Sequence, residues 1–276
     1  MRHRFAAARR SLDGERDRRR SAASIVRRGI AVGLLALVFA PALAAVTANT
    51  ERERRVAEQI VPQLMVGDAV WLATPRHPRV LALYTEPAKP TQHAVIVVHG
   101  LGVSPDWNLI GVLRTELANL GFATLSVQMP VLAAEAPRED YDALFPDARE
   151  RLDAAVGWLR AKGYSAIGVV SHSLGAGMVN DWLAKTGAPP VRAWAPVGML
   201  VDFVAPPREA VLDVVAEHDM PPALAFAKTR ARVLRHDGCS RALVVAGTDH
   251  YFEGSAKRLA EAIAPFLSRA LGGACG

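Results

Sequence analysis

The sequence predicts an α/β fold, a mostly parallel, doubly wound sheet with helices on both faces. Short runs that are apolar at nearly every position recur along the chain, such as 94–98 and 166–170. Such runs are typical of strands buried on both faces, as in a parallel sheet. Segments with helical spacing alternate with these runs from residue 94 to the end, which is the pattern of doubly wound α/β proteins. A hydrophobic content of 51% is enough to fill a core.

The elements follow in order along the chain. An amphipathic lead-in helix is expected within 46–66 and an early strand at 79–85. Ser104 and Pro105 predict a helix start, an N-cap followed by proline, and the helix runs to about Asn119. Further strands are expected at 94–98, 123–128, 166–170, 191–196, 210–216 and 241–246, and further helices at 147–161, after 175, at 222–232 and at 254–270. The segment between the strands at 191–196 and 210–216 is too short for a large cap domain.

The N-terminal segment has the pattern of an export signal. Arg27 and Arg28 precede an apolar run at 29–40, and Ala42-Leu43-Ala44 matches a small-residue cleavage site. The run is shorter than the roughly 20 residues of a membrane span. We therefore expect a signal peptide with an Arg-rich n-region over 1–45, one domain over 46–276, and a periplasmic or secreted protein. An uncleaved membrane anchor is the alternative, and the route, Sec or twin-arginine, stays open.

The basic charge of the chain lies in this segment. The formal net charge is +6, and residues 1–28 hold ten arginines against three acidic residues, a net +7. The difference, 6 − 7, leaves about −1 for the rest of the chain. This balance offers no basic surface for a nucleic acid, so no nucleic-acid partner is expected.

A nucleophile motif stands where a buried strand meets a helix, in Ser171-His172-Ser173-Leu174-Gly175. A sharp turn there lifts one serine hydroxyl above the sheet edge and demands small residues two positions to either side. Gly175 meets that demand. Ser171 replaces the usual first glycine; it is small enough, but its hydroxyl needs a partner. Ser173 is the expected nucleophile.

A second glycine-rich motif, His99-Gly100-Leu101-Gly102, follows an earlier buried strand. A tetrahedral oxyanion needs donors that are already oriented. In this arrangement one amide comes from the residue after the nucleophile, Leu174, and the other from the loop after the earlier strand. Leu101 is the candidate for the second donor and Gly102 the alternative. His99 is expected to fix the loop rather than to transfer protons.

A base and an acid are expected to act together with Ser173. His250 follows the last strand, at the sheet edge where sites form in open α/β sheets. Asp219 follows the preceding strand and sits in a turn, which favours it over Glu217, the runner-up. The remaining histidines and carboxylates fit these roles less well by position: His172, His218, His236, Asp213 and Asp249. The chain order is then Ser173, Asp219, His250, as expected of a nucleophile elbow.

With these motifs the sequence resembles the α/β-hydrolase superfamily over about residues 79–270. Asp106-Trp107 and the segment 124–130 also resemble a group of exported bacterial α/β-hydrolase-like proteins of unknown function. The resemblance implies the α/β-hydrolase fold and a hydrolase, but it supplies no substrate, because one fold hosts many reactions.

We therefore expect a serine esterase or related acyl hydrolase that needs no cofactor or metal and acts on a small-molecule ester or acyl substrate. The loop 131–147, with Tyr141 and Phe145, is expected to shape the substrate pocket. The alternative is a catalytically silent envelope binding protein of the same fold, favoured by Ser171 in place of glycine. The oligomeric state stays open.

The two cysteines are expected to form a disulfide. Cys239 precedes the last strand, at the edge opposite the site. The final helix runs back antiparallel to that strand, and Gly272 and Gly273 let the tail turn, so Cys275 reaches the same edge. An exported protein meets an oxidising compartment, which permits the pairing.

Overall fold

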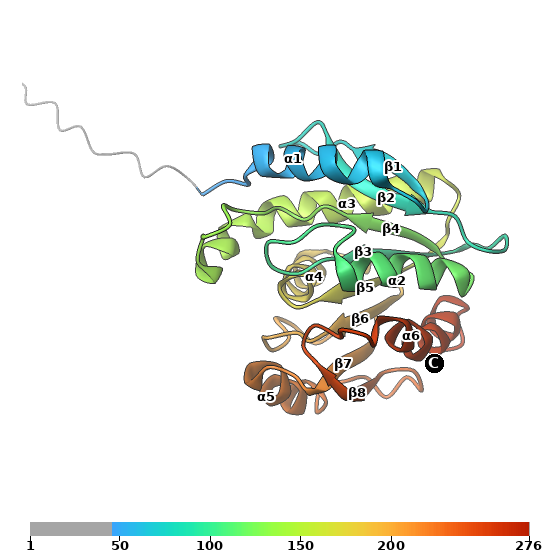
Figure 1. Cartoon of the computed structure of the whole chain (residues 1–276). Helices are drawn as coiled ribbons and strands as arrows, with labels where there is room; N and C mark the ends of the chain where they lie inside the picture. Colours follow the sequence, from blue (N-terminus) through green and yellow to red (C-terminus); the bar gives the residue numbers. More distant parts are fainter. Residues whose placement is uncertain (1–45, 276) are drawn as a thin grey trace, which may run out of the picture. The chain divides into compact units, whose positions relative to one another are not determined.

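The computed structural model describes residues 46–275, and the predicted signal peptide at 1–45 lies outside the described residues. In this part of the chain, eight strands form one sheet in the order β1-β2-β4-β3-β5-β6-β7-β8 (Figure 1). The strands are β1 Asp68–Leu72, β2 Val80–Thr85, β3 His93–Val98, β4 Ala123–Val127, β5 Ala166–His172, β6 Ala193–Val197, β7 Ala210–His218 and β8 Arg241–Asp249.

The sheet is mostly parallel, which confirms the predicted fold class. β1 pairs with β2 and β2 with β4 in antiparallel orientation, whereas the six strands from β3 to β8 run parallel to one another. The central strands β4, β5 and β6 are buried at every position, as their continuous apolar runs predict. The carboxyl ends of the parallel strands therefore meet at one edge of the sheet, where the candidate site lies.

The helices and short 3-10 turns are α1 Thr50–Ile60, η1 Val61–Gln63, α2 Asn108–Asn119, η2 Arg138–Leu144, α3 Phe145–Ala161, α4 Leu174–Lys185, α5 Pro221–Arg230 and α6 Ala256–Leu271. α2 and α6 pack together on one face of the sheet, and α3 and α4 on the other (Figure 1). α1 packs through Ala57 on Leu81 and Leu83 of β2.

The sequence analysis missed one strand and placed the start of one helix wrongly. β1 was not predicted: it is short and mostly only half-buried, so it lacks the long apolar run of the central strands. The helix expected from Ser104 begins at Asn108 instead. The amide of Trp107 donates to the Ser104 carbonyl at 3.2 Å, and the Pro105 carbonyl accepts from the Ser126 hydroxyl at 2.6 Å. These bonds hold 104–107 as a turn against β4.

Within residues 46–275 no large cap interrupts the sheet, as predicted. The segment 198–209 connects β6 to β7 directly. The loop 131–147 contains η2, and Tyr141 lies buried there with its hydroxyl accepting from the Leu132 amide at 3.2 Å. The Tyr141 ring therefore belongs to the core rather than to an open substrate surface. Across residues 46–275, none of the helices has the length and apolarity needed to span a bilayer.

At the opposite sheet edge a disulfide joins Cys239, just before β8, to Cys275, just after α6, with Cα atoms 5.6 Å apart. The Arg192 guanidinium donates to the Leu271 carbonyl at 3.0 Å and holds the end of α6 close to the start of β6. The turn after α6 uses Gly273, whose φ of +78° lies in the region that favours glycine.

Candidate active site

Ser173 stands at the junction of β5 and α4 in a strained turn. Its φ is +54° and its ψ is −122°, a combination that non-glycine residues rarely adopt. The Ser173 amide donates to the Val197 carbonyl of β6 at 2.9 Å, which holds the turn against the neighbouring strand. Such strain persists only where the surroundings fix it, and it clusters at functional sites.

Gly175 explains why the chain can make this turn. A Cβ atom at Gly175 would lie 2.2 Å from the His99 carbonyl oxygen and 2.9 Å from Val98 Cγ1. Any side chain would therefore force α4 away from the end of β3. The requirement for a small residue two positions after Ser173, expected from the sequence, has this steric cause.

Three side chains form a hydrogen-bonded chain at the carboxyl edge of the sheet. His250 Nε2 lies 3.0 Å from Ser173 Oγ, and His250 Nδ1 lies 2.6 Å from Asp219 Oδ1. A carboxylate only accepts hydrogen bonds, so Nδ1 carries the proton and Nε2 is left to accept from the serine hydroxyl. Ser173 is 9% exposed and the other two are more deeply buried. The sequence-predicted residues thus meet in the order and geometry that proton transfer from a serine requires.

Asp219 is held as a carboxylate by several donors. The amide of Ala216 donates to its Oδ2 at 3.0 Å, and that of Met220 to its Oδ1 at 2.8 Å. Burial opposes ionisation, but the hydrogen bonds from His250 and these amides together keep the pKa of Asp219 below its usual value. The group is therefore negative at neutral pH and able to orient the His250 ring.

Gly198, directly after β6, was not identified from the sequence. Its φ is +60°, and a Cβ there would lie 2.9 Å from His250 Nδ1 and 3.3 Å from Asp219 Oδ2. The backbone thus packs directly against the His–Asp pair, where a side chain would clash with both. A glycine immediately after a buried strand on the site edge is the signal that sequence reasoning could have used.

The alternative residues lie elsewhere. The Ser171 hydroxyl is buried and accepts from Trp194 Nε1 at 2.8 Å, which supplies the partner it needs. Glu217 points to the surface and accepts from the Gly247 amide at 2.7 Å. Asp213 pairs with Arg230 in the interior.

The remaining alternatives are also occupied or exposed. Asp249 accepts from the amide of Tyr251 at 3.0 Å. His218 and His236 are exposed. Within the described residues, the Ser173 hydroxyl and the His250 ring make no hydrogen bond to the side chains of Asp249, His218 or His236.

The loop after β3 lies against the serine turn. A Cβ at Gly100 would stand 3.2 Å from Ser173 Cβ, so backbone and nucleophile are in close approach. The Leu101 side chain points outward and is 42% exposed. Within residues 46–275, neither the Leu101 amide nor the Leu174 amide has an acceptor. Both predicted oxyanion donors are therefore available to a ligand.

His99 anchors that loop, as expected. Its Nδ1 donates to the Gly100 carbonyl at 2.9 Å, and its Nε2 accepts from the Met129 amide at 2.9 Å. Burial lowers the pKa of His99 to about 4, so the ring is neutral in ordinary buffers. Gln128 Nε2 completes the contact at 3.1 Å from His99 Nε2.

The described residues contain no group of three or more His, Cys, Asp or Glu side chains arranged to hold a metal ion.

Comparison with known proteins gives the same fold. Residues 27–149 match a family described as "Protein of unknown function (DUF3530)". That match includes the loop at His99 but ends before Ser173. No curated protein matches.

Solved structures match over most of the chain. The dienelactone hydrolase of Anabaena variabilis has 21% identity to this chain and a TM-score of 0.62. The match covers 73% of this chain and 96% of the Anabaena chain. The esterase domain of a Rhodothermus marinus protein has 17% identity, a TM-score of 0.60 and coverages of 74% and 99%. A lidless α/β serine hydrolase of Xanthomonas campestris has 18% identity and a TM-score of 0.59. That match covers 74% of this chain and 95% of the Xanthomonas chain. This chain therefore has the α/β-hydrolase fold.

Proposed function

We propose that this chain is an exported serine hydrolase that cleaves esters or related acyl bonds through an acyl-enzyme. The observation that carries the proposal is the hydrogen-bonded chain from Ser173 through His250 to Asp219, built on a strained turn at the carboxyl edge of the sheet. The esterase and hydrolase activities named for structures of the same fold support it.

In this mechanism His250 Nε2 takes the proton of Ser173 as the hydroxyl oxygen attacks the acyl carbon. The C–O bond to the leaving alcohol breaks, and His250 returns its proton to that alcohol. Water then attacks the acyl-enzyme with His250 again as base, which releases the acid and restores the serine. Asp219 stabilises the imidazolium formed in each step. Amides and thioesters would use the same groups.

The amides of Leu174 and Leu101 are the proposed donors to the oxyanion. Leu174 begins α4, so its N–H belongs to the first turn, whose amides have no partner within the helix. The helix dipole adds a favourable field for negative charge at this end. A donor of this kind is worth about two to three orders of magnitude in turnover in comparable sites.

Covalent labelling tests the proposal. A fluorophosphonate should modify the purified protein once, and peptide mass spectrometry should place the adduct on Ser173. His250→Ala should abolish labelling, because the serine then loses its base, while the exposed His218→Ala, as matched control, should label normally. No adduct on wild-type protein that is folded by circular dichroism would favour the silent binding protein instead.

Export is the second part of the proposal. It is supported by the arginine pair and apolar run before Ala42-Leu43-Ala44. Fractionation of expressing cells should recover the protein outside the cytoplasm with a new N-terminus at about Ala45. Full-length protein in the cytoplasmic fraction would reject export without touching the chemistry.

A further inference from the structure

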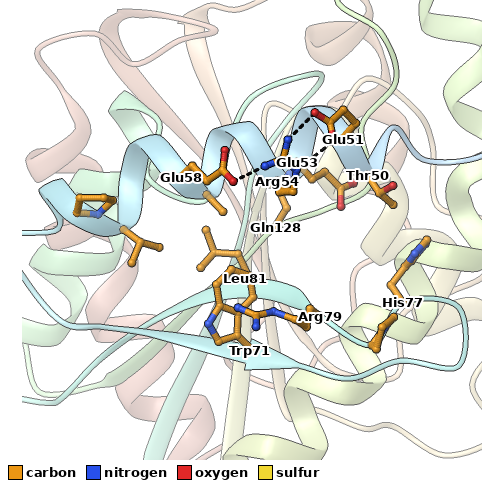
Figure 2. A pocket seen from close by; sticks show the side chains of 14 residues that line it. Thr50, Glu51, Glu53, Arg54, Glu58, Trp71, His77, Arg79, Leu81 and Gln128 are labelled. Atoms are coloured by element: carbon orange, nitrogen blue, oxygen red, sulfur yellow. Dashed lines mark hydrogen bonds and ion pairs between the residues drawn. The ribbon is translucent and has the colours of Figure 1, made fainter.

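A cavity of about 750 Å³ opens between α1 and the β1–β2 hairpin (Figure 2). Its walls come from one side of α1, from β1 and β2, and from Gln128 at the end of β4. None of Ser173, Asp219 or His250 lines it. The volume lies in the range of small-molecule sites, about 300 to 1,000 Å³.

Part of the cavity wall is apolar. Trp71 of β1 is 41% exposed, an uncommon state for so large an apolar side chain, and it faces the cavity beside Leu81. The other apolar residues of the wall are Ala57, Val61, Pro62 and Pro78. Covering this surface with a hydrocarbon chain or ring removes it from water and favours binding.

Gln128 supplies an acceptor that lacks a donor. The residue is 2% exposed and lines the cavity. Its Nε2 donates to the Met129 carbonyl at 2.7 Å, which fixes the amide orientation, and its Oε1 has no hydrogen-bond partner in the described chain. A buried acceptor without a donor costs about 1 to 3 kcal/mol. A ligand hydroxyl or amide N–H would remove that cost.

The three glutamates of the wall already have cationic partners. Glu51 and Glu58 pair with Arg54 on the rim, as the dashed lines of Figure 2 show. Glu53 accepts from Arg151 at 3.0 Å. These carboxylates therefore leave little negative charge to attract a cationic ligand.

Arg79 is the cation of the wall that lacks an anion. Its guanidinium lies over the Trp71 ring, 4.2 Å from the centroid, and makes no ion pair or hydrogen bond with the described residues. Stacking holds the group at the cavity while its N–H donors stay available. Guanidinium donors match a carboxylate in a two-bond geometry.

We propose that this cavity is a second ligand site, separate from Ser173, for an amphiphilic carboxylic acid that also carries a hydroxyl or amide N–H. The hydrocarbon part covers Trp71 and Leu81, the carboxylate binds Arg79, and the hydroxyl or amide donates to Gln128. The proposal does not depend on the hydrolase activity.

The test uses 3-hydroxydecanoate with the wild-type full chain, below its aggregation concentration. Titration calorimetry should give saturable binding, and Trp71 emission should shift to the blue as the ring is covered. The shift should vanish in Trp71→Phe. Decane-1,3-diol, which lacks the acid, should bind about tenfold more weakly, and decanoate, which lacks the donor, about fivefold more weakly.

Two variants test whether Arg79 binds the carboxylate. Arg79→Gln should reduce the acid's affinity to that of the diol, whereas Arg160→Gln, an exposed arginine outside the cavity, should leave it unchanged. Arg79 is exposed, so the variant should keep the wild-type melting temperature. Any of four results would overturn the proposal. The first two are the absence of a Trp71-dependent signal and equal affinity for the acid and the diol. The others are equal affinity for the two acids and tighter binding of decyltrimethylammonium.

Discussion

His172 Nε2 donates a hydrogen bond to the main-chain carbonyl of His250 at 2.8 Å, and the two rings pack with centroids 4.9 Å apart. The residue before the proposed nucleophile therefore holds the residue that is proposed to activate it. The sequence analysis set His172 aside because of its position in the chain, directly before Ser173. That reasoning did not foresee that the side chain would position His250 through its backbone.

This relationship predicts the behaviour of two variants. His172→Phe keeps a ring but leaves the His250 carbonyl buried without a donor, so the free energy of unfolding should fall by about 1 to 3 kcal/mol. Ester turnover should fall about tenfold or more as His250 loses its position. His172→Gln retains a donor and should recover most of kcat. Kinetics with p-nitrophenyl acetate and urea unfolding measure both effects, and equal kcat for the two variants would contradict the positioning role.

The pH dependence of stability should report the two buried histidines. Burial lowers the pKa of His172, and likewise that of His99, to about 4 from 6.5. Between these values the unfolded chain binds more protons than the folded one, so stability falls as the pH drops from 6.5 towards 4. The two rings together give a slope of about 2 kcal/mol per pH unit.

Urea unfolding at several pH values between 6.5 and 4.5 measures that slope. His172→Gln should reduce it by about half, because one of the two rings is gone. His218→Gln removes an exposed histidine and should leave it unchanged. A wild-type stability that is flat over this range would show that the histidines titrate normally.

Alanine variants of the two serines of the motif should differ in activity and in stability. Ser173→Ala should lower turnover by several orders of magnitude and leave the fold intact. Ser171→Ala should keep most of the activity but lose about 1 kcal/mol of stability, because Trp194 Nε1 then lacks its acceptor. Ester hydrolysis and thermal melting on the same preparations distinguish them. Activity retained in Ser173→Ala and lost in Ser171→Ala would move the nucleophile.

The acid is tested by a matched pair. Asp219→Asn removes the negative charge that holds the His250 tautomer, and turnover should fall by about three to four orders of magnitude. Glu217→Gln changes an exposed carboxylate that contacts the Gly247 amide, and its effect should be less than twofold. Steady-state kinetics at pH 8 measures both. A larger loss from the Glu217 change would reassign the acid.

The sequence was sufficient for the parts of the fold that local pattern determines. Continuous apolar runs predicted β3 to β6. Ser173, Asp219 and His250 follow β5, β7 and β8, and their meeting at one sheet edge followed from the parallel topology. The parts of the fold and site that could not be predicted from the sequence depend on contacts between segments distant in the chain. Gly198 matters only because His250 lies above it, and the turn at 104–107 depends on a bond from Ser126.

The cavity beside α1 shows the same limit. Trp71 lies in β1, Arg79 just before β2 and Gln128 just after β4, and no sequence motif links the three residues, so only the structure shows that they line one cavity. β1, which carries Trp71, lacks the apolar run that identifies the central strands.

The disulfide predicted between Cys239 and Cys275 should form in exported protein and pin α6 to the start of β8. Their Cα atoms are 5.6 Å apart, within the roughly 7 Å that a bridge allows. The bridge closes a loop of sequence separation 36, and such loops stabilise by about 2 to 4 kcal/mol, largely through the unfolded state. The bond lies at the amino-terminal end of β8, whereas His250 follows the carboxyl-terminal end.

Its loss should therefore lower stability without changing the chemistry. Thiol counting on denatured, unreduced periplasmic protein should find no free thiol, and reduction should release both. The double variant Cys239→Ser, Cys275→Ser should lose about 2 to 4 kcal/mol in urea unfolding while kcat stays within twofold of wild type. Wild-type protein kept in reductant retains both sulfur atoms without the bond and controls for the packing of the buried Cys239 sulfur. Two thiols in the unreduced sample, or an unchanged unfolding midpoint in the double variant, would reject the bridge.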